Sequence, residues 1–471
     1  MAIPGTEGHP LRVAVVGSGP GGFYAAEALL ESGLQVEIDL IERLPVPFGL
    51  VRFGVAPDHA KLKSVTTVFT QIAEDPRLRF FGNVELGRDL SVEQLGALYH
   101  AVIVATGAAG DRQLGIAGEH LAGVHAAGDF VGWYNGRPEC ADLEFDLQQE
   151  VAVVIGQGNV AIDVCRILAS PVDALRRTDI AAHALDALAQ SRIREIHLVG
   201  RRGPVQAKFT PKELRELGTL PGWQPRVDPA ALALNDASQA ELVLPGFVHA
   251  PRNLDILRGF AQTPADDGRR PLHLHFHCAP VALSGATRVE RIELEAQALS
   301  GEPGAQSAAP TGERLSLPAG LVLRSVGYRG TPLPGLPFDR VRGALPHRDG
   351  RIVDTGGEVL RGWYATGWIK RGPTGVIGTN RADSVDTVTS LLADLAQLDT
   401  LKAGRAGLLA QLAGDHRKVV DFDGWRAIAL AEAERGRAGG KPAEKFVRVE
   451  DMLHAAAVAE APQSRERACA R

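Results

Sequence analysis

A glycine-rich turn near the start of this 471-residue chain constrains its fold more than any other stretch. The apolar run Val13 to Val16 leads into a G-x-G-x-x-G turn from Gly17 to Gly22, and a helix-forming segment follows from Phe23 to Glu31. A strand, this turn and a helix in that order build the phosphate cradle of a dinucleotide-binding βαβ unit. The sequence therefore predicts an α/β fold with a parallel sheet that binds a dinucleotide at this turn.

The glycines of the turn have separate tasks. Gly17 permits a tight turn, Gly19 lets the backbone approach a pyrophosphate, and Gly22 lets the helix pack closely on the strand. The next strand, from Val36 to Ile41, ends in Glu42, near the spacing at which a carboxylate accepts hydrogen bonds from ribose hydroxyls. A glycine turn alone could serve packing and bind nothing, but the helix, strand and acid in register favour binding.

The composition is typical of a soluble globular protein, with 45% hydrophobic and 23% charged residues. The length is sufficient for two or three domains. A net charge of −5 argues against a nucleic-acid-binding protein. No apolar run approaches the length of a membrane span, and the first ten residues lack the character of a presequence. We therefore expect a cytoplasmic protein.

The four cysteines are scattered along the chain, and no two of them form a CxxC pair. This arrangement argues against a redox-active disulfide, a zinc ribbon and an iron–sulfur cluster in this chain. It fits a reducing compartment best.

A second dinucleotide-binding unit follows in the middle of the chain. The apolar strand Val151 to Ile155 leads into a turn with Gly156, Gly158 and Ala161, and then into a helix. Alanine at the third position is an accepted variant of the turn. Two phosphate cradles in one chain suggest two dinucleotides.

The end of the following strand identifies the second dinucleotide. The strand from Glu195 to Val199 is followed by Arg201 and Arg202, where the first unit has Glu42. A carboxylate repels a 2′-phosphate, whereas paired arginines bind it through charge-assisted hydrogen bonds. The second unit is therefore predicted to bind NADP. The alternative is that both arginines merely solvate the end of a strand, as clustered surface arginines often do.

Three histidines alternate in a short apolar stretch. On a strand, His273, His275 and His277 would share one face, which suggests a metal site. Three ligands in file along one strand converge poorly on a tetrahedral ion. We therefore predict a strand with a solvated face and no metal site.

Further stretches indicate how the domains are arranged. Pro45 to His59 is rich in proline and glycine, which indicates a rigid irregular loop of the kind that often carries function. Gly362 to Asn380 is a glycine-rich turn that leads into a helix, an arrangement suited to an anion or a flavin. Ser300 to Gly312 is predicted to be a surface loop. The strand Leu321 to Gly327 is predicted to return the chain to the first domain.

Together these segments resemble the adrenodoxin-reductase-type ferredoxin–NADP+ reductases, a family of flavoproteins with two dinucleotide-binding domains. The resemblance extends from residue 11 to nearly residue 455 with the motifs in the family's order. The segments that carry it are Gly17–Gly22, Pro45–His59, Gly156–Asp163, Gly200–Glu216 and Gly367–Gly378. The resemblance implies two Rossmann-like domains, in which an NADP-binding domain of residues 111–326 is inserted into a discontinuous FAD-binding domain of residues 1–110 and 327–471.

The resemblance also implies an activity. FAD is bound non-covalently, NADPH donates a hydride, and single electrons pass to a ferredoxin-type iron–sulfur protein, or flow in the reverse direction. The partner is expected to be a separate protein, because no ferredoxin-like cysteine module is fused to the chain, and the enzyme is expected to be a monomer. One alternative is an electron-transfer subunit of the glutamate-synthase type, whose cysteine-rich N-terminal region is missing here. Another is a flavin-binding scaffold without turnover, which would have little use for the arginine pair.

The family's cofactor-binding residues transfer to this chain position by position. Those implied for FAD are Gly17, Gly19, Pro20, Gly22, Glu42, Leu50, Val51, Gly107, Trp368, Gly375, Val376 and Ile377, of which Trp368 and residues 375–377 match the segment along the isoalloxazine ring. Those implied for NADP are Gln157, Gly158, Asn159, Val160, Arg201, Arg202, Glu213 and Gly375.

Two candidate catalytic residues and a basic patch complete the implied site. His59 and Glu213 match family residues near the flavin and the nicotinamide. Hydride transfer needs no acid or base, so we interpret them as orienting groups or as groups that manage a proton. The alternative is that they are ordinary polar residues of their segments. Lys212 and Arg215 fall where the family has basic residues that face an acidic partner.

Overall fold

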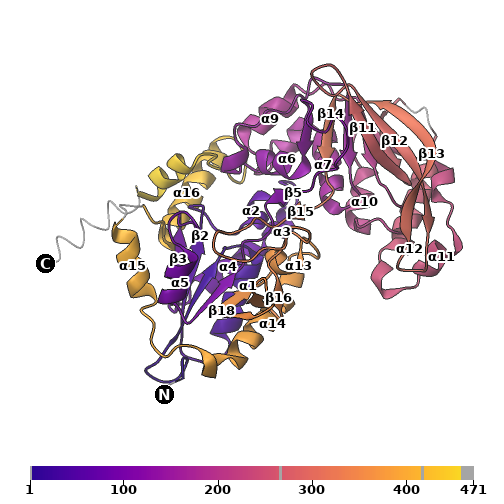
Figure 1. The fold of residues 1–471 in the computed structure, drawn as a ribbon. Coiled ribbons are helices and arrows are strands. Elements are labelled where there is room, and N and C mark those ends of the chain that lie inside the picture. The colour runs from indigo at the N-terminus through magenta and orange to yellow at the C-terminus, as the bar shows by residue number, and fades with distance from the viewer. Residues whose placement is uncertain (1–2, 265–267, 415–417, 458–471) are drawn as a thin grey trace. The chain divides into compact units, whose positions relative to one another are not determined.

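Two mainly parallel sheets organise the chain, one in each of two structural units (Figure 1). Unit 1 consists of residues 1–110 and 328–471, and unit 2 consists of residues 111–327. The computed structural model describes residues 3–264, 268–414 and 418–457. The two connecting segments, β5 (Gly110–Asp111) and β15 (Tyr328–Arg329), pair with each other as a two-stranded sheet.

The sheet of unit 1 has seven strands in the order β16-β17-β18-β4-β1-β2-β3. The five from β18 to β3 run parallel, and β16 and β17 extend the sheet in the antiparallel sense. The strands are β1 (Leu11–Val16), β2 (Val36–Glu42), β3 (Leu78–Gly82), β4 (Ala101–Val104), β16 (His347–Arg348), β17 (Arg351–Val353) and β18 (Val359–Ala365). Residues from both ends of the sequence therefore build one sheet.

Helices cover both faces of this sheet. They are α1 (Pro20–Leu30), α2 (Leu50–Phe53), α3 (Ala60–Lys63), α4 (Val65–Ala73), α5 (Val92–Leu98), α13 (Trp368–Arg371), α14 (Thr379–Ala393), α15 (Arg405–Gly414) and α16 (Phe422–Ala438), with a 3-10 turn η4 (Leu395–Gln397). Val13 and Val15 of β1 pack in one core with Phe23, whereas Val16 packs in another with Leu95. Two buried faces explain why β1 is apolar throughout instead of alternating.

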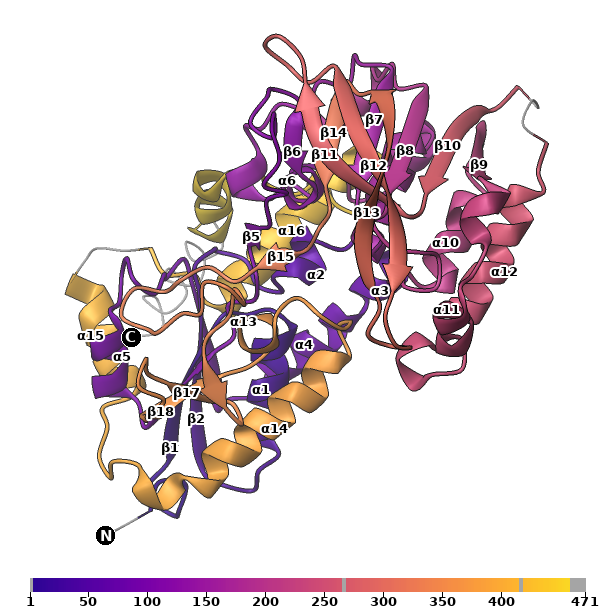
Figure 2. The same cartoon turned by 45° about the vertical axis from the view of Figure 1, so that its right-hand side comes forward.

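The main sheet of unit 2 has six parallel strands in the order β6-β14-β7-β8-β10-β9 (Figure 2). They are β6 (Val124–Ala126), β7 (Val151–Ile155), β8 (Glu195–Val199), β9 (Trp223–Val227), β10 (Arg270–His275) and β14 (Leu321–Arg324). A second, antiparallel sheet contains β11 (Cys278–Ser284), β12 (Arg291–Ser300) and β13 (Ser307–Pro318).

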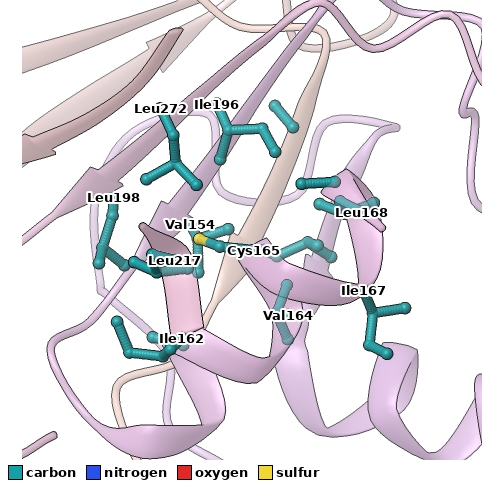
Figure 3. Close-up of a cluster of buried hydrophobic side chains, with 14 of the residues drawn as sticks. Val154, Ile162, Val164, Cys165, Ile167, Leu168, Ile196, Leu198, Leu217 and Leu272 are labelled. Atoms are coloured by element: carbon teal, nitrogen blue, oxygen red, sulfur yellow. The ribbon is translucent and has the colours of Figure 1, made fainter. Parts of the chain in front are cut away.

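The helices of unit 2 enclose a large apolar core. They are α6 (Ala127–Tyr134), α7 (Asn159–Ala169), α8 (Val172–Leu175), α9 (Ala182–Ala189), α10 (Pro211–Leu217), α11 (Asp236–Glu241) and α12 (Ala250–Ala261), with 3-10 turns η1 (Pro138–Cys140), η2 (Pro229–Leu232) and η3 (Pro245–Phe247). Figure 3 shows Ile162 and Cys165 of α7 packed against strand residues such as Val154. Val153 and Val199 face the opposite side, where they pack against β11 and β12.

One predicted loop is partly a strand. Residues 300–312 were expected to form a surface loop, but β13 occupies positions 307–318 and pairs with β12 in antiparallel register. Most side chains of β13 are exposed, so small and polar residues are tolerated on this strand at the edge of its sheet. None of the helices in the described ranges is long and apolar enough to cross a bilayer.

Candidate functional site

The first glycine turn joins β1 to α1, and two of its three glycines leave no space for a side chain. Gly17 has a φ of 106°, and a Cβ there would lie 2.5 Å from the Ala105 carbonyl oxygen. A Cβ at Gly22 would lie 1.9 Å from the Gly17 carbonyl oxygen. A Cβ at Gly19, in contrast, would meet nothing within 4 Å. The turn is closed beneath Gly17 and Gly22 and open at Gly19, which is where a pyrophosphate needs to approach the backbone.

Glu42 lies at the carboxyl end of β2 and its side chain contacts the same turn. Ser18 donates to Glu42 Oε2 from its backbone N at 3.0 Å and from its Oγ at 2.7 Å, and the Leu44 N–H donates to Oε1 at 3.2 Å. A carboxylate accepts more than three hydrogen bonds, so these contacts orient Glu42 and leave acceptor capacity for a ribose hydroxyl. Among the described residues no side chain caps α1, which begins with Pro20. Its first N–H groups remain available to an anion.

The proline-rich loop packs on this turn. The Phe48 N–H donates to the Ser18 carbonyl at 3.0 Å, and a Cβ at Gly49 would lie 3.0 Å from Gly19 Cα. Helix α2 starts immediately afterwards with Leu50, which is half-buried, and Val51, which is 1% exposed in the core of unit 1. Any contact of Val51 with a cofactor therefore falls to its backbone.

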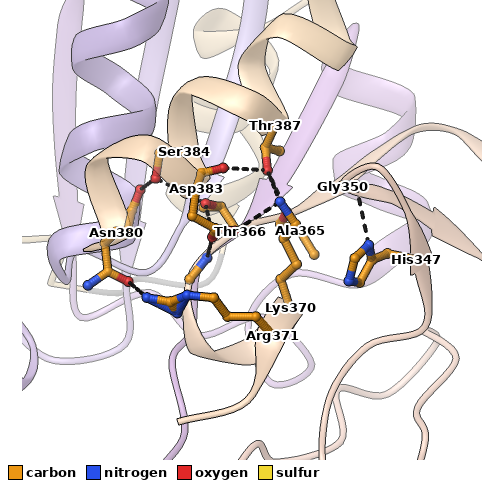
Figure 4. A network of polar contacts seen from close by, with 12 residues as sticks. His347, Gly350, Ala365, Thr366, Lys370, Arg371, Asn380, Asp383, Ser384 and Thr387 are labelled. Carbon is orange, nitrogen blue, oxygen red and sulfur yellow. Dashed lines mark hydrogen bonds and ion pairs between the residues drawn. The ribbon is translucent and has the colours of Figure 1, made fainter. Parts of the chain in front are cut away.

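A network of polar side chains holds the C-terminal glycine-rich segment (Figure 4). Asp383 of α14 accepts hydrogen bonds from the Gly367 N–H at 2.6 Å and from Thr366 Oγ1 at 3.1 Å, and pairs with Lys370 Nζ at 3.0 Å. Asp383 thus fixes the turn between β18 and α13. Ser384 of the same helix donates to the Gly21 carbonyl at 3.0 Å, which ties α14 to the start of α1.

Gly107 and the segment assigned to the isoalloxazine ring present open backbone and an exposed apolar side chain. A Cβ at Gly107 would meet nothing within 4 Å, and Val376 is 62% exposed beside Gly375, whose φ is 81°. The half-buried Trp368 stacks on Tyr328 with ring centroids 5.8 Å apart. The backbone at Gly107 and the side chain of Val376 are therefore open to a ligand, whereas a Cβ at Gly375 would lie 2.7 Å from Thr379 Oγ1.

The second cradle follows the same design within unit 2. Gly156 has a φ of 145°, and a Cβ there would lie 2.1 Å from the Ser325 carbonyl oxygen, whereas a Cβ at Gly158 would meet nothing within 4 Å. Asn159 Oδ1 accepts a hydrogen bond from the Thr210 N–H at 2.9 Å, which orders the start of α7. Val160 follows in the first turn of α7 and is half-buried.

The side chain of Gln157 lies against Gly200, the residue before Arg201 and Arg202. Its Nε2 is buried and has no hydrogen-bond partner among the residues that the structure describes. A Cβ at Gly200 would lie 1.7 Å from Gln157 Cδ, so a side chain at that position would displace the Gln157 amide. The unsatisfied amide beside the open turn fits a site whose polar ligand supplies the missing acceptor.

Arg201 and Arg202 follow β8 on a well-held backbone. The Gly200 N–H donates to the His275 carbonyl at 2.9 Å, and the Arg202 carbonyl accepts from the His277 N–H at 3.1 Å. Arg201 is exposed and Arg202 is half-buried. Within the described part of the chain, neither guanidinium pairs with a carboxylate, so both charges are available to an anionic ligand.

Glu213 is buried in unit 2. It lies on α10, is 8% exposed, and its Oε2 has no hydrogen-bond partner within the described ranges. The nearby Arg166 is also buried: desolvation lowers the pKa of its guanidinium, while Glu216 and Glu213 oppose that shift. Glu213 therefore carries an unsatisfied acceptor that a ligand hydroxyl or amide could engage.

The remaining assigned residues are a buried histidine in unit 1 and two exposed basic residues in unit 2. His59 is also 8% exposed and stands at the start of α3 in unit 1. Lys212 and Arg215 are both exposed on α10, and Lys212 makes a long ion pair with Glu216 at 3.7 Å.

The histidines correct the sequence prediction. His273 and His275 lie on β10, but His277 leaves the strand with a φ of 55°. His273 and His275 do not lie on a solvated face, because both contact His197 of β8, which is only 3% exposed. Sequence reasoning missed His197 because the neighbours of β10 depend on strand order and not on spacing along the chain.

Comparison with known proteins agrees with this architecture. The family model described as "Pyridine nucleotide-disulphide oxidoreductase" matches residues 11–216. The chain is 45% identical to the NADPH-ferredoxin reductase FprA of Mycobacterium tuberculosis, covering 94% of this chain and 99% of that protein. It is 44% identical to the human mitochondrial NADPH:adrenodoxin oxidoreductase, covering 94% of this chain and 91% of that protein.

A solved structure gives the same result. The structure of Mycobacterium tuberculosis FprA in complex with NADPH matches with a TM-score of 0.89 at 44% identity, covering 95% of this chain and all of that one. The predicted fold class of two dinucleotide-binding units and the predicted family are thereby confirmed. The chain belongs to the family of the NADPH-ferredoxin reductases and NADPH:adrenodoxin oxidoreductases.

Proposed function

We propose that this protein is an NADPH-dependent ferredoxin reductase, an FAD flavoprotein that exchanges electrons between NADPH and a ferredoxin-type iron–sulfur protein. Relatives with this activity in their names align over almost the whole chain. The observation that carries the proposal is the contrast between the two cradles. Glu42 stands at the strand end beside the first, and two arginines without carboxylate partners in the described part of the chain stand beside the second.

Unit 1 would hold FAD. The open backbone at Gly19 and the start of α1 would bind the pyrophosphate, and the oriented Glu42 carboxylate would accept from the ribose. Gly107, Trp368 and the segment from Gly375 to Ile377 would contact the flavin ring. Bound FAD supplies the conversion of a two-electron hydride donor into single electrons for an iron–sulfur acceptor.

Unit 2 would hold NADPH. Gly158, Asn159 and Val160 at the start of α7 would bind the pyrophosphate through backbone N–H groups. The guanidinium groups of Arg201 and Arg202 would bind the 2′-phosphate and thereby select NADPH over NADH. Gln157 would offer its buried amide to the same ligand.

Glu213 and His59 would position the reactants instead of taking part in a bond-breaking step. Hydride transfer requires close approach and alignment of donor and acceptor, which positioned side chains provide. Glu213 has an unsatisfied Oε2 that can accept a hydrogen bond from a donor on the nicotinamide side of the ligand. His59 is buried near the start of α3 and would fulfil the same task toward the flavin.

The exposed Lys212 and Arg215 would face an acidic iron–sulfur protein. Complementary charge at the edge of such a contact raises association rates more than affinity. The reductase would act as a monomer in the cytoplasm.

The decisive experiment compares the two coenzymes on the purified flavoprotein. We expect the protein to retain FAD and to reduce ferricyanide much faster with NADPH than with NADH. Addition of a ferredoxin should then support reduction of cytochrome c. A colourless protein that does not take up FAD, or equal rates with both coenzymes, would contradict the proposal.

A further inference from the structure

A cluster of three histidines and one glutamate lies on the main sheet of unit 2, and none of the four was assigned to a cofactor. Its members come from β8 and β10, which are neighbouring parallel strands (Figure 2). His197 pairs in register with His273, so both side chains project from the same face of the sheet. Glu195 and His275 lie two residues from them on their own strands and share that face.

The carboxylate of Glu195 bridges two of the histidines. Glu195 Oε1 lies 3.2 Å from His197 Nε2 and 3.1 Å from His273 Nε2. One ligand atom from each of these three residues lies within 4.8 Å of the other two. In a tetrahedral zinc site with bonds of about 2.1 Å, ligand atoms are about 3.4 Å apart. The distances from the carboxylate oxygen to the two ring nitrogens are thus close to the separation that a bound ion requires.

A fourth residue is placed to support one of the ligands. His197 Nδ1 lies 2.9 Å from His275 Nε2. A metal-bound histidine usually donates its other N–H to a nearby acceptor, which fixes the ring and its tautomer. If His197 Nε2 binds an ion, its Nδ1–H can donate to His275, so the contact becomes an outer hydrogen bond of the site.

Burial in the sheet lowers the pKa of the three clustered rings. Burial, with a smaller contribution from the neighbouring His273, lowers the pKa of His197 to about 4. Burial, followed by the charges of His197 and His273, lowers the pKa of His275 to about 4. Burial also lowers the pKa of His273, although Glu195 opposes this effect.

We propose that Glu195, His197 and His273 form a binding site for a divalent transition-metal ion of the zinc type, with His275 as the outer hydrogen-bond partner of His197. Two nitrogen ligands and one carboxylate match the ligand preferences of zinc, and a fourth position remains for water. Arg226 of β9 lies opposite His273 in register, and its positive charge weakens the site relative to a fully anionic one. An ion here would join β8 to β10, the two strands whose ends hold the Arg201–Arg202 backbone.

The test uses the full-length flavoprotein with any affinity tag removed, since a histidine tag would itself bind metal. Equilibrium dialysis against Zn²⁺ followed by elemental analysis should show one equivalent bound to the wild type. Glu195→Gln preserves side-chain volume and hydrogen bonding and should lose that equivalent. His273→Ala should also lose it. His275→Ala should keep the site with about tenfold weaker affinity, as expected for an outer partner.

Two further measurements complete the test. His120→Ala, which changes an exposed histidine of the same unit, should bind zinc like the wild type. Because an ion bound only to the native state stabilises it, Zn²⁺ should raise the Tm of the wild type and of His120→Ala but not that of Glu195→Gln. Bound Co²⁺ should give visible d–d absorption that Glu195→Gln lacks. The proposal is overturned if the wild type binds no zinc, or if Glu195→Gln and His273→Ala bind as much as the wild type.

Discussion

Removal of both guanidinium groups after β8 tests the assignment of the second dinucleotide. In the variant Arg201→Ala/Arg202→Ala, the backbone of this segment should persist. It is held by the Gly200 N–H, which donates to the His275 carbonyl, and by the Arg202 carbonyl, which accepts from the His277 N–H. Within the described ranges neither arginine has a carboxylate partner, so removing both leaves no buried carboxylate without its ion pair. The substitution should therefore affect the ligand and leave the fold intact.

The size of the effect follows from the two lost contacts. A hydrogen bond to a charged group contributes about 1.5–3 kcal/mol. Arg201 is exposed and Arg202 half-buried, so solvent screening favours the lower figure for each. Two such contacts amount to about 3 kcal/mol, which is about a hundredfold in affinity. We expect the KM for NADPH to rise by about this factor and the KM for NADH to change less than about threefold, because NADH has no 2′-phosphate.

The assay is steady-state reduction of ferricyanide with each coenzyme over a range of salt concentrations. In the wild type the KM for NADPH should rise with ionic strength, whereas in the double variant this dependence should largely disappear. Arg215→Ala, an exposed arginine of the same unit, is the matched control and should leave both KM values unchanged. An equal loss of activity with NADPH and NADH would refute the assignment of the 2′-phosphate to these arginines.

Three other substitutions test the remaining parts of the structure. Gly22→Ala places a Cβ 1.9 Å from the Gly17 carbonyl oxygen, so the protein should purify with much less FAD, as measured by its visible absorbance; full flavin content would contradict the close packing of α1. Lys212→Glu with Arg215→Glu should slow reduction of an acidic ferredoxin about tenfold at low salt, as expected for lost electrostatic steering, and spare ferricyanide; an equal loss with ferricyanide would remove the basis for a partner surface. In the wild type the buried Arg52 guanidinium lies 2.5 Å from a carboxylate oxygen of Glu432. Glu432→Ala leaves this guanidinium without the carboxylate and should lower the free energy of unfolding by about 3–5 kcal/mol in urea denaturation. A change below about 1 kcal/mol would show that this pair is not desolvated.

Much of the fold was predictable because the strongest constraints are local. Strand, glycine turn and helix are contiguous in sequence, so positions such as Gly17 and Gly156 could be assigned before their surroundings were known. The acid at Glu42 and the arginines after β8 are also local, since they stand at the ends of the next strands. Their contacts were less predictable: the two hydrogen bonds from Ser18 to Glu42 depend on how the turn is oriented over the sheet.

The errors have a common physical origin in long-range pairing. The first half of β13, residues 307–312, was expected to be a loop because its composition is that of a solvated segment, yet its pairing with β12 makes it a strand. The histidines of β10 were interpreted along one strand, whereas their partner His197 is contributed by β8. Glu213 was placed near the nicotinamide by resemblance alone. That its Oε2 has no hydrogen-bond partner among the described residues depends on the packing of α10 and α7. Packing between distant segments decides such features, and spacing along the chain does not encode it.

The two cradles show which part of a dinucleotide site carries specificity. Gly17 and Gly156 both have positive φ, and in each case the carbonyl of a neighbouring strand end blocks any side chain. Both turns are then open two residues later, at Gly19 and Gly158. The backbone therefore offers the same pyrophosphate contact twice, and the turns themselves cannot distinguish FAD from NADP. The choice falls to the charge at the end of the following strand, so exchange of the turns should preserve coenzyme preference while exchange of the strand ends should not.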